Sequence, residues 1–395
     1  MKKAPGETRR FCCLVNVFPL LLIGFPAKVF KRDVIKKGCD SFLKILITGA
    51  NGFLGKKLSL KLLEQGHELY LLVRSRKRLD AFMHGEGSGF SKQIHILEGD
   101  VTEEHLGLNR ELAGSLKGKI DAIYHSAALL SFDERDRDMT FEVNVGGTEN
   151  VLKLALEINC PKVLYISTAY TVGTETDGAE ALYSLDRHFV NPYEASKCEA
   201  EHLVYTFRDK LDVVILRPGI IIGDSRTGEA DTNFGLYGFL KGIKILKKRS
   251  LRKPNGQTCR IYLDPEVAQN FVPVNYVIDT LDAALIHAEN GGIYNITNPN
   301  PPLQSDIYEI VKEVLDFPQL EMCVPGESAE MTNEEKAFHD SMSIFHSYFQ
   351  RTIDFPSDNT EKLLAAAGLP MLQMDRDVLK RIIAGYLLNK TSVSS

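Results

Sequence analysis

The sequence predicts an α/β fold with a doubly wound parallel sheet and a smaller C-terminal lobe. Two observations support this fold class. From Leu43 onward, short β-branched or aliphatic runs alternate with helical patterns, as in βαβ units. The first of these runs leads directly into a glycine-rich turn that opens a helix. The composition, 44% apolar and 25% charged, is that of an ordinary globular protein.

The first half of the chain carries the regular part of this pattern. The segment 53–65 places Leu58, Leu62 and Leu63 on one helical face and stops at Gly66, which favours a helix C-terminus. Because strands and helices alternate, the strands are expected to be parallel. The predicted strands cover 43–48, 68–73, 94–98, 122–125, 163–167 and 213–216, and the other predicted helices cover 138–157 and 192–207.

The pattern is looser in the second half of the chain. It predicts a helix over 274–287, a strand over 292–296 and a helix that begins at Ser305. Another helix is expected from Thr332, with Glu335 completing a capping box. The last helix, 376–388, places apolar residues on one face, and the tail 390–395 is expected to fray.

The cysteines and the net charge exclude several classes of site. The seven cysteines are odd in number, scattered and never spaced C-x-x-C, which favours a reducing compartment. No H-E-x-x-H motif or other clustered metal-ligand pattern occurs, so we predict no metal. The net charge of −5 gives no general attraction to nucleic acid, and we predict no nucleic-acid partner.

The N-terminal extension, 1–42, contains an apolar run over 11–26 with basic residues on both sides. The run is shorter than the ~20 residues that a spanning helix needs, and Asn16, Pro19 and Gly24 interrupt it. Three interpretations remain open: an extension that the fold does not need, a peripheral membrane anchor and a targeting segment. We expect a cytoplasmic protein, with peripheral membrane association through this run as the alternative. A homodimer is among the oligomeric states that the sequence allows.

A glycine-rich turn joins the first strand to the first helix. Glycines let the chain turn tightly, let a pyrophosphate approach backbone N–H groups and let the helix pack closely on the strand. The position of this turn predicts a dinucleotide site in a Rossmann domain. The cofactor-binding residues expected here are Thr48, Gly49, Asn51, Gly52, Phe53, Leu54 and Gly55.

The end of the second strand indicates which dinucleotide binds. A sheet that prefers NAD usually carries an acidic residue there, which bonds the ribose 2′-hydroxyl. This chain has Arg74 and Arg76 instead, whose guanidinium groups would complement a 2′-phosphate. We therefore predict NADP(H), against the alternative of a solvated basic loop. By analogy with this kind of fold, Asp100 and Val101 are expected to reach the adenine.

Tyr193 and Lys197 lie four residues apart, on one face of a predicted helix. A phenol with an ordinary pKa near ~10 is a poor acid–base catalyst at neutral pH, and a neighbouring cation favours the phenolate. The pair is common on protein surfaces. Here it follows the glycine-rich turn and the hydroxyl pair Ser167-Thr168, and this order predicts a proton-transfer site.

In that order of motifs the chain resembles the extended short-chain dehydrogenases/reductases, over most of 43–300. The resemblance implies that Thr168 polarises the substrate oxygen, with Ser167 as a rival, and that Tyr193 transfers the proton. It also implies that Lys197 holds the nicotinamide ribose and lowers the pKa of Tyr193. Matching segments at 125–128, 144–148 and 217–219 add Ala127, Ala128, Asn144 and Pro218 to the expected cofactor site.

Within that family, the segments 167–170 and 217–228 are similar to those of thioester reductase domains and fatty acyl reductases. Relatives that act on sugar nucleotides usually lack the second pattern. The resemblance implies NADPH-dependent reduction of a small-molecule or carrier-bound acyl thioester to an aldehyde or alcohol. Two alternatives stay open: a sugar-nucleotide epimerase/dehydratase or hydroxysteroid-type dehydrogenase on the same scaffold, and a non-catalytic NADP-binding module.

The resemblance also suggests a domain organisation. We expect the extension 1–42, an NADP-binding Rossmann domain over 43–228, and a substrate-covering lobe over 229–395 with some segments returning to the Rossmann core. The chain lacks the extra C-terminal region typical of eukaryotic fatty acyl reductases, so we expect it to be closer to free-standing or bacterial forms.

A basic cluster within 241–253 contrasts with the acidic net charge. It could attract coenzyme A phosphates, an acidic carrier protein or anionic lipid headgroups. A solvated helix face explains it at least as well. Its members are Lys241, Lys244, Lys247, Lys248, Arg249, Arg252 and Lys253.

Overall fold

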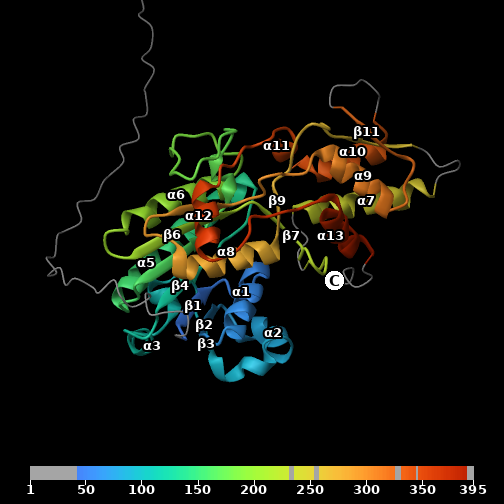
Figure 1. Ribbon diagram of the computed structural model, residues 1–395. Helices are drawn as coiled ribbons and strands as arrows, with labels where there is room; N and C mark the ends of the chain where they lie inside the picture. The colour runs from blue at the N-terminus through green and yellow to red at the C-terminus, as the bar shows by residue number, and fades with distance from the viewer. Residues whose placement is uncertain (1–41, 231–234, 253–257, 325–330, 344–345, 389–395) are drawn as a thin grey trace, which may run out of the picture. The chain divides into compact units, whose positions relative to one another are not determined.

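The computed structural model describes residues 42–230, 235–252, 258–324, 331–343 and 346–388 (Figure 1). Its centre is a seven-stranded, fully parallel sheet in the order β10-β6-β5-β4-β1-β2-β3. The predicted α/β fold class is therefore confirmed. The strands are β1 (Lys44–Thr48), β2 (Glu68–Val73), β3 (Ile94–Glu98), β4 (Ala122–His125), β5 (Lys162–Ile166), β6 (Asp212–Pro218) and β10 (Ile293–Ile296).

Helices cover both faces of this sheet. Successive side chains of a strand point to opposite faces, so in β1 Ile45 and Ile47 join one apolar core while Leu46 joins the other. The first core contains α1 (Phe53–Glu64), α2 (Asp80–His84), α8 (Val274–His287) and α12 (Asp358–Ala366). The second contains α3 (Arg110–Ser115), α5 (Gly147–Glu157) and α6 (Pro192–Thr206).

The strand order reverses between β1 and β4. In open parallel sheets, ligands bind beyond the carboxyl ends of the strands at such a switch point. The two strand ends there are Thr48 and His125, which pair in the sheet register. The glycine-rich turn therefore leaves β1 at the place where a dinucleotide site is expected.

The single helix predicted over 138–157 has three parts. It comprises α4 (Arg137–Phe141), the π-helical segment η5 (Glu142–Gly146) and α5. A π-helical turn within an α-helix often marks a functional site. The buried Asn144 lies in this segment.

The C-terminal part has an apolar core of its own. Figure 1 shows α7, α9, α10 and α13 close to one another, and each of them contributes buried residues to this core. The capping box at Thr332 is confirmed, because the Thr332 hydroxyl accepts from the Glu335 N–H and the Glu335 carboxylate accepts from the Thr332 N–H. The helices are α7 (Leu236–Ser250), α9 (Gln304–Val314), α10 (Asn333–Ser341), α11 (His346–Phe349) and α13 (Arg376–Leu388), and the strands pair as β7 (Ile220–Ile222) with β9 (Phe271–Pro273) and β8 (Cys259–Tyr262) with β11 (Leu320–Cys323).

Several expectations about the ends of the chain fall outside the described residues. They concern the apolar run in 1–42 and the tail 390–395. In the part of the chain that the structure describes, no helix is both long enough and apolar enough to cross a membrane. The division at residue 228 stays a prediction, although β10, α8 and α12 pack with the sheet.

Candidate functional site

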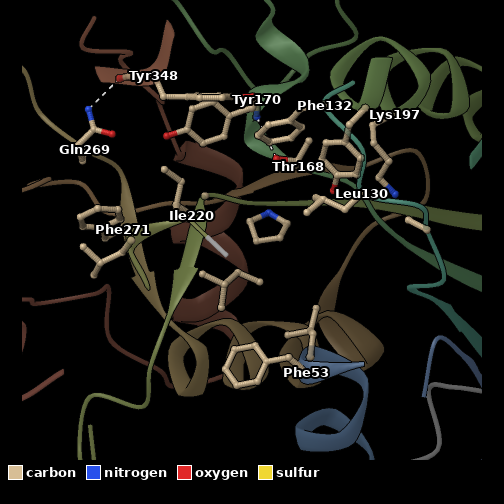
Figure 2. A pocket seen from close by; sticks show the side chains of 18 of the residues that line it. Phe53, Leu130, Phe132, Thr168, Tyr170, Lys197, Ile220, Gln269, Phe271 and Tyr348 are labelled. Atoms are coloured by element: carbon tan, nitrogen blue, oxygen red, sulfur yellow. Dashed lines mark hydrogen bonds between the residues drawn. The ribbon is translucent and has the colours of Figure 1, made fainter. Parts of the chain in front are cut away.

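A cavity of about 450 Å³ brings together the glycine-rich turn, the end of β5, the start of α6 and several C-terminal segments (Figure 2). Of the predicted site residues, its wall includes Gly49, Gly52, Phe53, Leu54, Gly55, Ala128, Thr168, Tyr193, Lys197 and Pro218. The predicted residues outside the wall are Thr48, Asn51, Arg74, Arg76, Asp100, Val101, Ala127 and Asn144.

The glycine-rich turn has the geometry that a dinucleotide requires. Gly49 has a φ of +74°, and a Cβ there would lie 2.7 Å from the Ala127 nitrogen. A Cβ on Gly55 would lie 2.2 Å from the Gly49 carbonyl oxygen, so α1 packs against the turn only because this side chain is missing. The N-cap, Gly52, provides no side-chain cap, and the first turn of α1 has no acidic residue. Backbone N–H groups there can bind an anion.

The Thr48 hydroxyl belongs to a network of hydrogen bonds around His125. The Thr148 hydroxyl donates its single hydrogen to the Asn144 carbonyl (2.6 Å), so toward His125 Nε2 (3.0 Å) it can only accept. The other ring nitrogen, Nδ1, then accepts from Thr48 Oγ1 (2.7 Å), which in turn accepts from the Ala127 N–H (3.2 Å). Burial lowers the pKa of His125 to about 3, which keeps the ring neutral. This network ties the ends of β1 and β4 together.

Tyr193 and Lys197 lie one turn apart on α6, and both line the cavity. Lys197 Nζ donates to the Ile166 carbonyl (2.6 Å) and lies 4.3 Å from the Tyr165 ring centre. Burial lowers the pKa of Lys197 to about 7.

The expectation that Lys197 lowers the pKa of Tyr193 stays a prediction. In this structure burial, together with the charge of Glu194, raises the pKa of Tyr193 well above its ordinary value. The physical reason is that removing the phenol from water disfavours the phenolate. The same burial weakens the charge on Lys197, whose pKa falls to about 7.

Ser167 and Thr168 both line the cavity at the end of β5. The Thr168 hydroxyl accepts from the Tyr170 N–H (3.3 Å) and caps the short helix η6 (Ala169–Val172). The Ser167 hydroxyl is buried and has no hydrogen-bond partner among the described residues. Both hydroxyls therefore stay candidates for binding the substrate oxygen.

Asn144 connects the loop after β4 to α6. Its Nδ2 donates to the Leu129 carbonyl (3.0 Å) and to Ser196 Oγ (2.9 Å), while its Oδ1 accepts from the Leu129 N–H (2.7 Å). Ser196 precedes Lys197 on α6. Asn144 is thus placed to position Lys197, and its contact with a cofactor stays a prediction.

Two arginines follow β2, and one of them has a backbone partner. Arg74 and Arg76 are both exposed after the end of β2. The Arg76 guanidinium also donates to the Ile96 carbonyl (3.4 Å), and this side chain borders a second depression with Tyr70 and Lys119. The binding of a 2′-phosphate by either arginine stays a prediction.

The predicted adenine contacts form a turn after β3. Asp100 Oδ1 accepts from the Thr102 N–H (3.1 Å) and hydroxyl (3.0 Å). Val101 is buried, and its carbonyl accepts from Asn150 Nδ2 (2.9 Å). The turn is fixed by these contacts, while its role in binding adenine stays a prediction.

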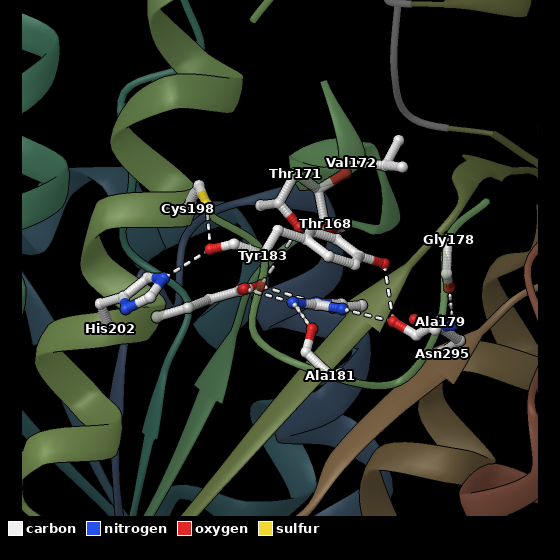
Figure 3. A network of polar contacts seen from close by, with 12 residues as sticks. Thr168, Thr171, Val172, Gly178, Ala179, Ala181, Tyr183, Cys198, His202 and Asn295 are labelled. Carbon is white, nitrogen blue, oxygen red and sulfur yellow. Dashed lines mark hydrogen bonds and ion pairs between the residues drawn. The ribbon is translucent and has the colours of Figure 1, made fainter. Parts of the chain in front are cut away.

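A buried ion pair braces α6 against β6 (Figure 3). The guanidinium of Arg217 and the carboxylate of Glu201 approach to 2.6 Å, and neither side chain is exposed to solvent. Arg217 also donates to the carbonyls of Ala179 (3.2 Å) and Ala181 (2.9 Å). Glu201 lies one turn beyond Lys197. The pair therefore fixes α6 and the loop that precedes it.

Sequence reasoning missed most of the cavity wall contributed by the C-terminal part. This wall is largely apolar, and its residues come from segments scattered along the chain. They are Leu236 and Phe239 of α7, Leu263, Gln269, Phe271, Gln304, Ile307, Tyr348 and Phe349. The apolar face of α7 was the available signal in the sequence.

Two members of the basic cluster on α7 have structural partners. Lys244 Nζ donates to the Leu387 carbonyl (2.8 Å) near the end of α13, and Lys247 Nζ donates to the Leu315 carbonyl at the end of α9. Cations at helix C-termini are favourable. Lys253 lies outside the described residues.

Comparisons with known proteins identify relatives of this chain. A fatty acyl-CoA reductase of Drosophila melanogaster, wat, is 31% identical over 264 residues, 55% of this chain and 49% of the relative. A carboxylic acid reductase of Segniliparus rugosus is 33% identical over 188 residues, 40% of this chain and 16% of that protein. The chain spans about half the length of the Drosophila relative.

Solved structures extend the comparison. The terminal R domain of the myxalamid biosynthetic pathway superimposes with a TM-score of 0.73 at 25% identity, over 88% of this chain and 92% of that one. A family model described as male sterility protein matches residues 47–281, more than half of the chain. The predicted resemblance is thus confirmed: the chain belongs to the male sterility protein family, within the extended short-chain dehydrogenase/reductase type of oxidoreductase.

Proposed function

We propose that the protein is an NADPH-dependent reductase of acyl thioesters, bound to coenzyme A or to a carrier, which yields an aldehyde or an alcohol. One observation carries this proposal. A single cavity joins the glycine-rich turn, the hydroxyl, phenol and ammonium groups of Thr168, Tyr193 and Lys197, and an apolar wall.

The residues around the turn fit a dinucleotide. A Cβ at Gly49 or Gly55 would clash with neighbouring backbone atoms, so only glycine fits at these positions. At the start of α1 no side chain caps the backbone N–H groups, which leaves them able to bind a phosphate. The exposed Arg74 supports NADPH over NADH, because a guanidinium suits a 2′-phosphate. When bound, the nicotinamide would supply the hydride.

The side chains of the site would handle the oxygen and the proton. Thr168 or Ser167 would hold the carbonyl oxygen, and Tyr193 would donate a proton to it as negative charge develops. A phenol with a raised pKa stays protonated, as a proton donor must. For a thioester, one hydride and one proton give a hemithioacetal, which releases thiol and leaves an aldehyde. A second hydride and proton would give the alcohol.

The apolar wall supports an acyl substrate over a sugar nucleotide. Phe239, Phe271 and Phe349 contribute aromatic surface to the cavity. A sugar nucleotide presents hydroxyl and phosphate groups, and burying these against such a wall without partners costs free energy. An acyl chain has no such groups.

The experiment is NADPH and NADH oxidation by the purified protein with a panel of acyl-CoA and carrier-bound thioesters. Wild type should turn over at least one thioester with NADPH, and Tyr193→Phe should abolish turnover while NADPH binding persists. If no thioester is reduced while NADP(H) still binds, the substrate assignment falls, and sugar nucleotides and sterols become the next panel.

A further inference from the structure

Two buried glutamines lie side by side in the C-terminal wall of the cavity. Gln269 lies two residues before β9, Gln304 is the first residue of α9, and each is 2% exposed. The Gln269 N–H donates to the Pro302 carbonyl (2.9 Å), and the Gln304 N–H donates to the Val267 carbonyl (2.8 Å). These two bonds flank an antiparallel bridge, so the backbone fixes both residues.

Both glutamine side chains bind the same short helix. Gln269 Nε2 donates to the Tyr348 carbonyl (2.9 Å), and Gln304 Nε2 donates to the Phe349 carbonyl (2.7 Å), at the end of α11. A carbonyl oxygen can only accept a hydrogen bond, so these contacts fix which end of each amide is the nitrogen. The amide oxygens therefore lie on the sides turned away from these carbonyls.

The two amide oxygens differ in their surroundings. Gln304 Oε1 is fully buried and has no hydrogen-bond partner among the described residues. Gln269 Oε1 lies on the cavity side of its amide (Figure 2), and within the described part of the chain no group donates to it. Gln269 therefore presents a hydrogen-bond acceptor to the cavity, whereas the Gln304 oxygen is out of reach of a ligand.

This acceptor belongs to a largely apolar part of the wall, which also includes Leu263, Phe271 and Ile307. A purely aliphatic ligand would cover the Gln269 oxygen and leave it without a partner. Burying an amide oxygen without a hydrogen bond costs free energy. A ligand with an N–H or O–H group opposite this oxygen would avoid that cost.

We propose that Gln269 is a specificity-determining residue that accepts a hydrogen bond from an N–H or O–H group of the acyl thioester. This inference rests on the proposed function. Two parts of such a substrate carry donors: the pantetheine arm of coenzyme A or of a carrier contains amide N–H groups and a hydroxyl group, and some acyl chains are hydroxylated. Both sources offer the same chemistry to Gln269.

The test compares kcat/KM for thioesters that differ by a single donor. In one series, each amide N–H of a pantetheine thioester is replaced in turn by an ester oxygen, and its secondary hydroxyl by hydrogen. In the other series, a hydroxyl group is added at successive carbons of the acyl chain. We expect the wild type to prefer the donor-bearing member by at least about tenfold at one position, and the series that contains this position identifies the source.

Gln269→Met should remove this preference, because methionine has a similar length but only a weak acceptor. Gln304→Met is the matched control. It loses the equivalent bond to α11, from Gln304 Nε2 to the Phe349 carbonyl, but its amide oxygen does not face the cavity. We expect it to change kcat/KM for both members of a pair alike and to keep the preference.

Three results would overturn the proposal while the reductase assignment stands: no preference in the wild type, a preference that survives Gln269→Met, or equal loss of the preference in both variants. The last would assign the preference to the position of α11. If Gln269→Met does not fold, Gln269→Asn withdraws the amide oxygen by one carbon and carries the same expectation. A protein that reduces no thioester would overturn the reductase assignment, and this inference with it.

Discussion

The two halves of the cavity are built in different ways. On the sheet side, the site consists of strand ends, a glycine-rich turn and the start of α6. Gly49 follows β1, Thr168 follows β5 and Lys197 lies on α6, so the backbone of regular elements sets the position of each. On the C-terminal side, the wall is assembled from side chains of α7, α9, α11 and the segment around β9. The difference suggests that the sheet side tolerates almost no change in backbone, whereas the other side can be reshaped one side chain at a time.

The largest expected effect comes from adding a methyl group to the turn. Gly49→Ala should reduce NADPH affinity more than about 100-fold and lower the free energy of unfolding by roughly 2–4 kcal/mol, because the Cβ would lie 2.7 Å from the Ala127 nitrogen. Isothermal titration calorimetry and chemical denaturation measure both quantities.

Gly118→Ala is the matched control for that prediction. Gly118 has a φ of +69°, close to the +74° of Gly49, but a Cβ there would meet nothing within 4 Å. Gly118→Ala should lower the free energy of unfolding only by the left-handed backbone strain, about 1–2 kcal/mol, and should leave the NADPH affinity unchanged. Equal losses of affinity in the two variants would mean that close packing at the turn is irrelevant.

A substitution in the C-terminal wall should change the KM for the acyl substrate and not the affinity for NADPH. Phe349→Leu should raise KM for the longest accepted acyl substrate by about tenfold, since part of its aromatic contact is lost, while the Kd for NADPH stays constant. Phe317→Leu provides the comparison: Phe317 is 1% exposed in the same core but lies outside the wall. A change in NADPH affinity with Phe349→Leu would contradict the separation of the two halves.

The same contrast explains what could be predicted from the sequence. The strands were predictable from their short apolar runs, and the turn and the Tyr193/Lys197 pair from the order of motifs along the chain. The short pairings β7 with β9 and β8 with β11 were not, since runs of three or four residues lack a detectable period. Phe239, Gln269 and Tyr348 meet only through tertiary packing, which no local pattern records. The burial that raises the pKa of Tyr193 is likewise a property of the whole fold, which no local pattern records.

A last effect, of the same tenfold order, concerns the choice of cofactor and the two exposed arginines that follow β2. Arg74→Gln should weaken NADPH binding by about tenfold and leave NADH binding unchanged, because only NADPH carries the 2′-phosphate. Arg76→Gln should leave both affinities nearly unchanged, since its guanidinium already donates to the Ile96 carbonyl (3.4 Å). Fluorescence titration with each nucleotide measures the ratios. Equal losses in both variants would show that the basic segment acts as a diffuse charge, and a loss with Arg76→Gln alone would mean that its side chain leaves Ile96 when the cofactor binds.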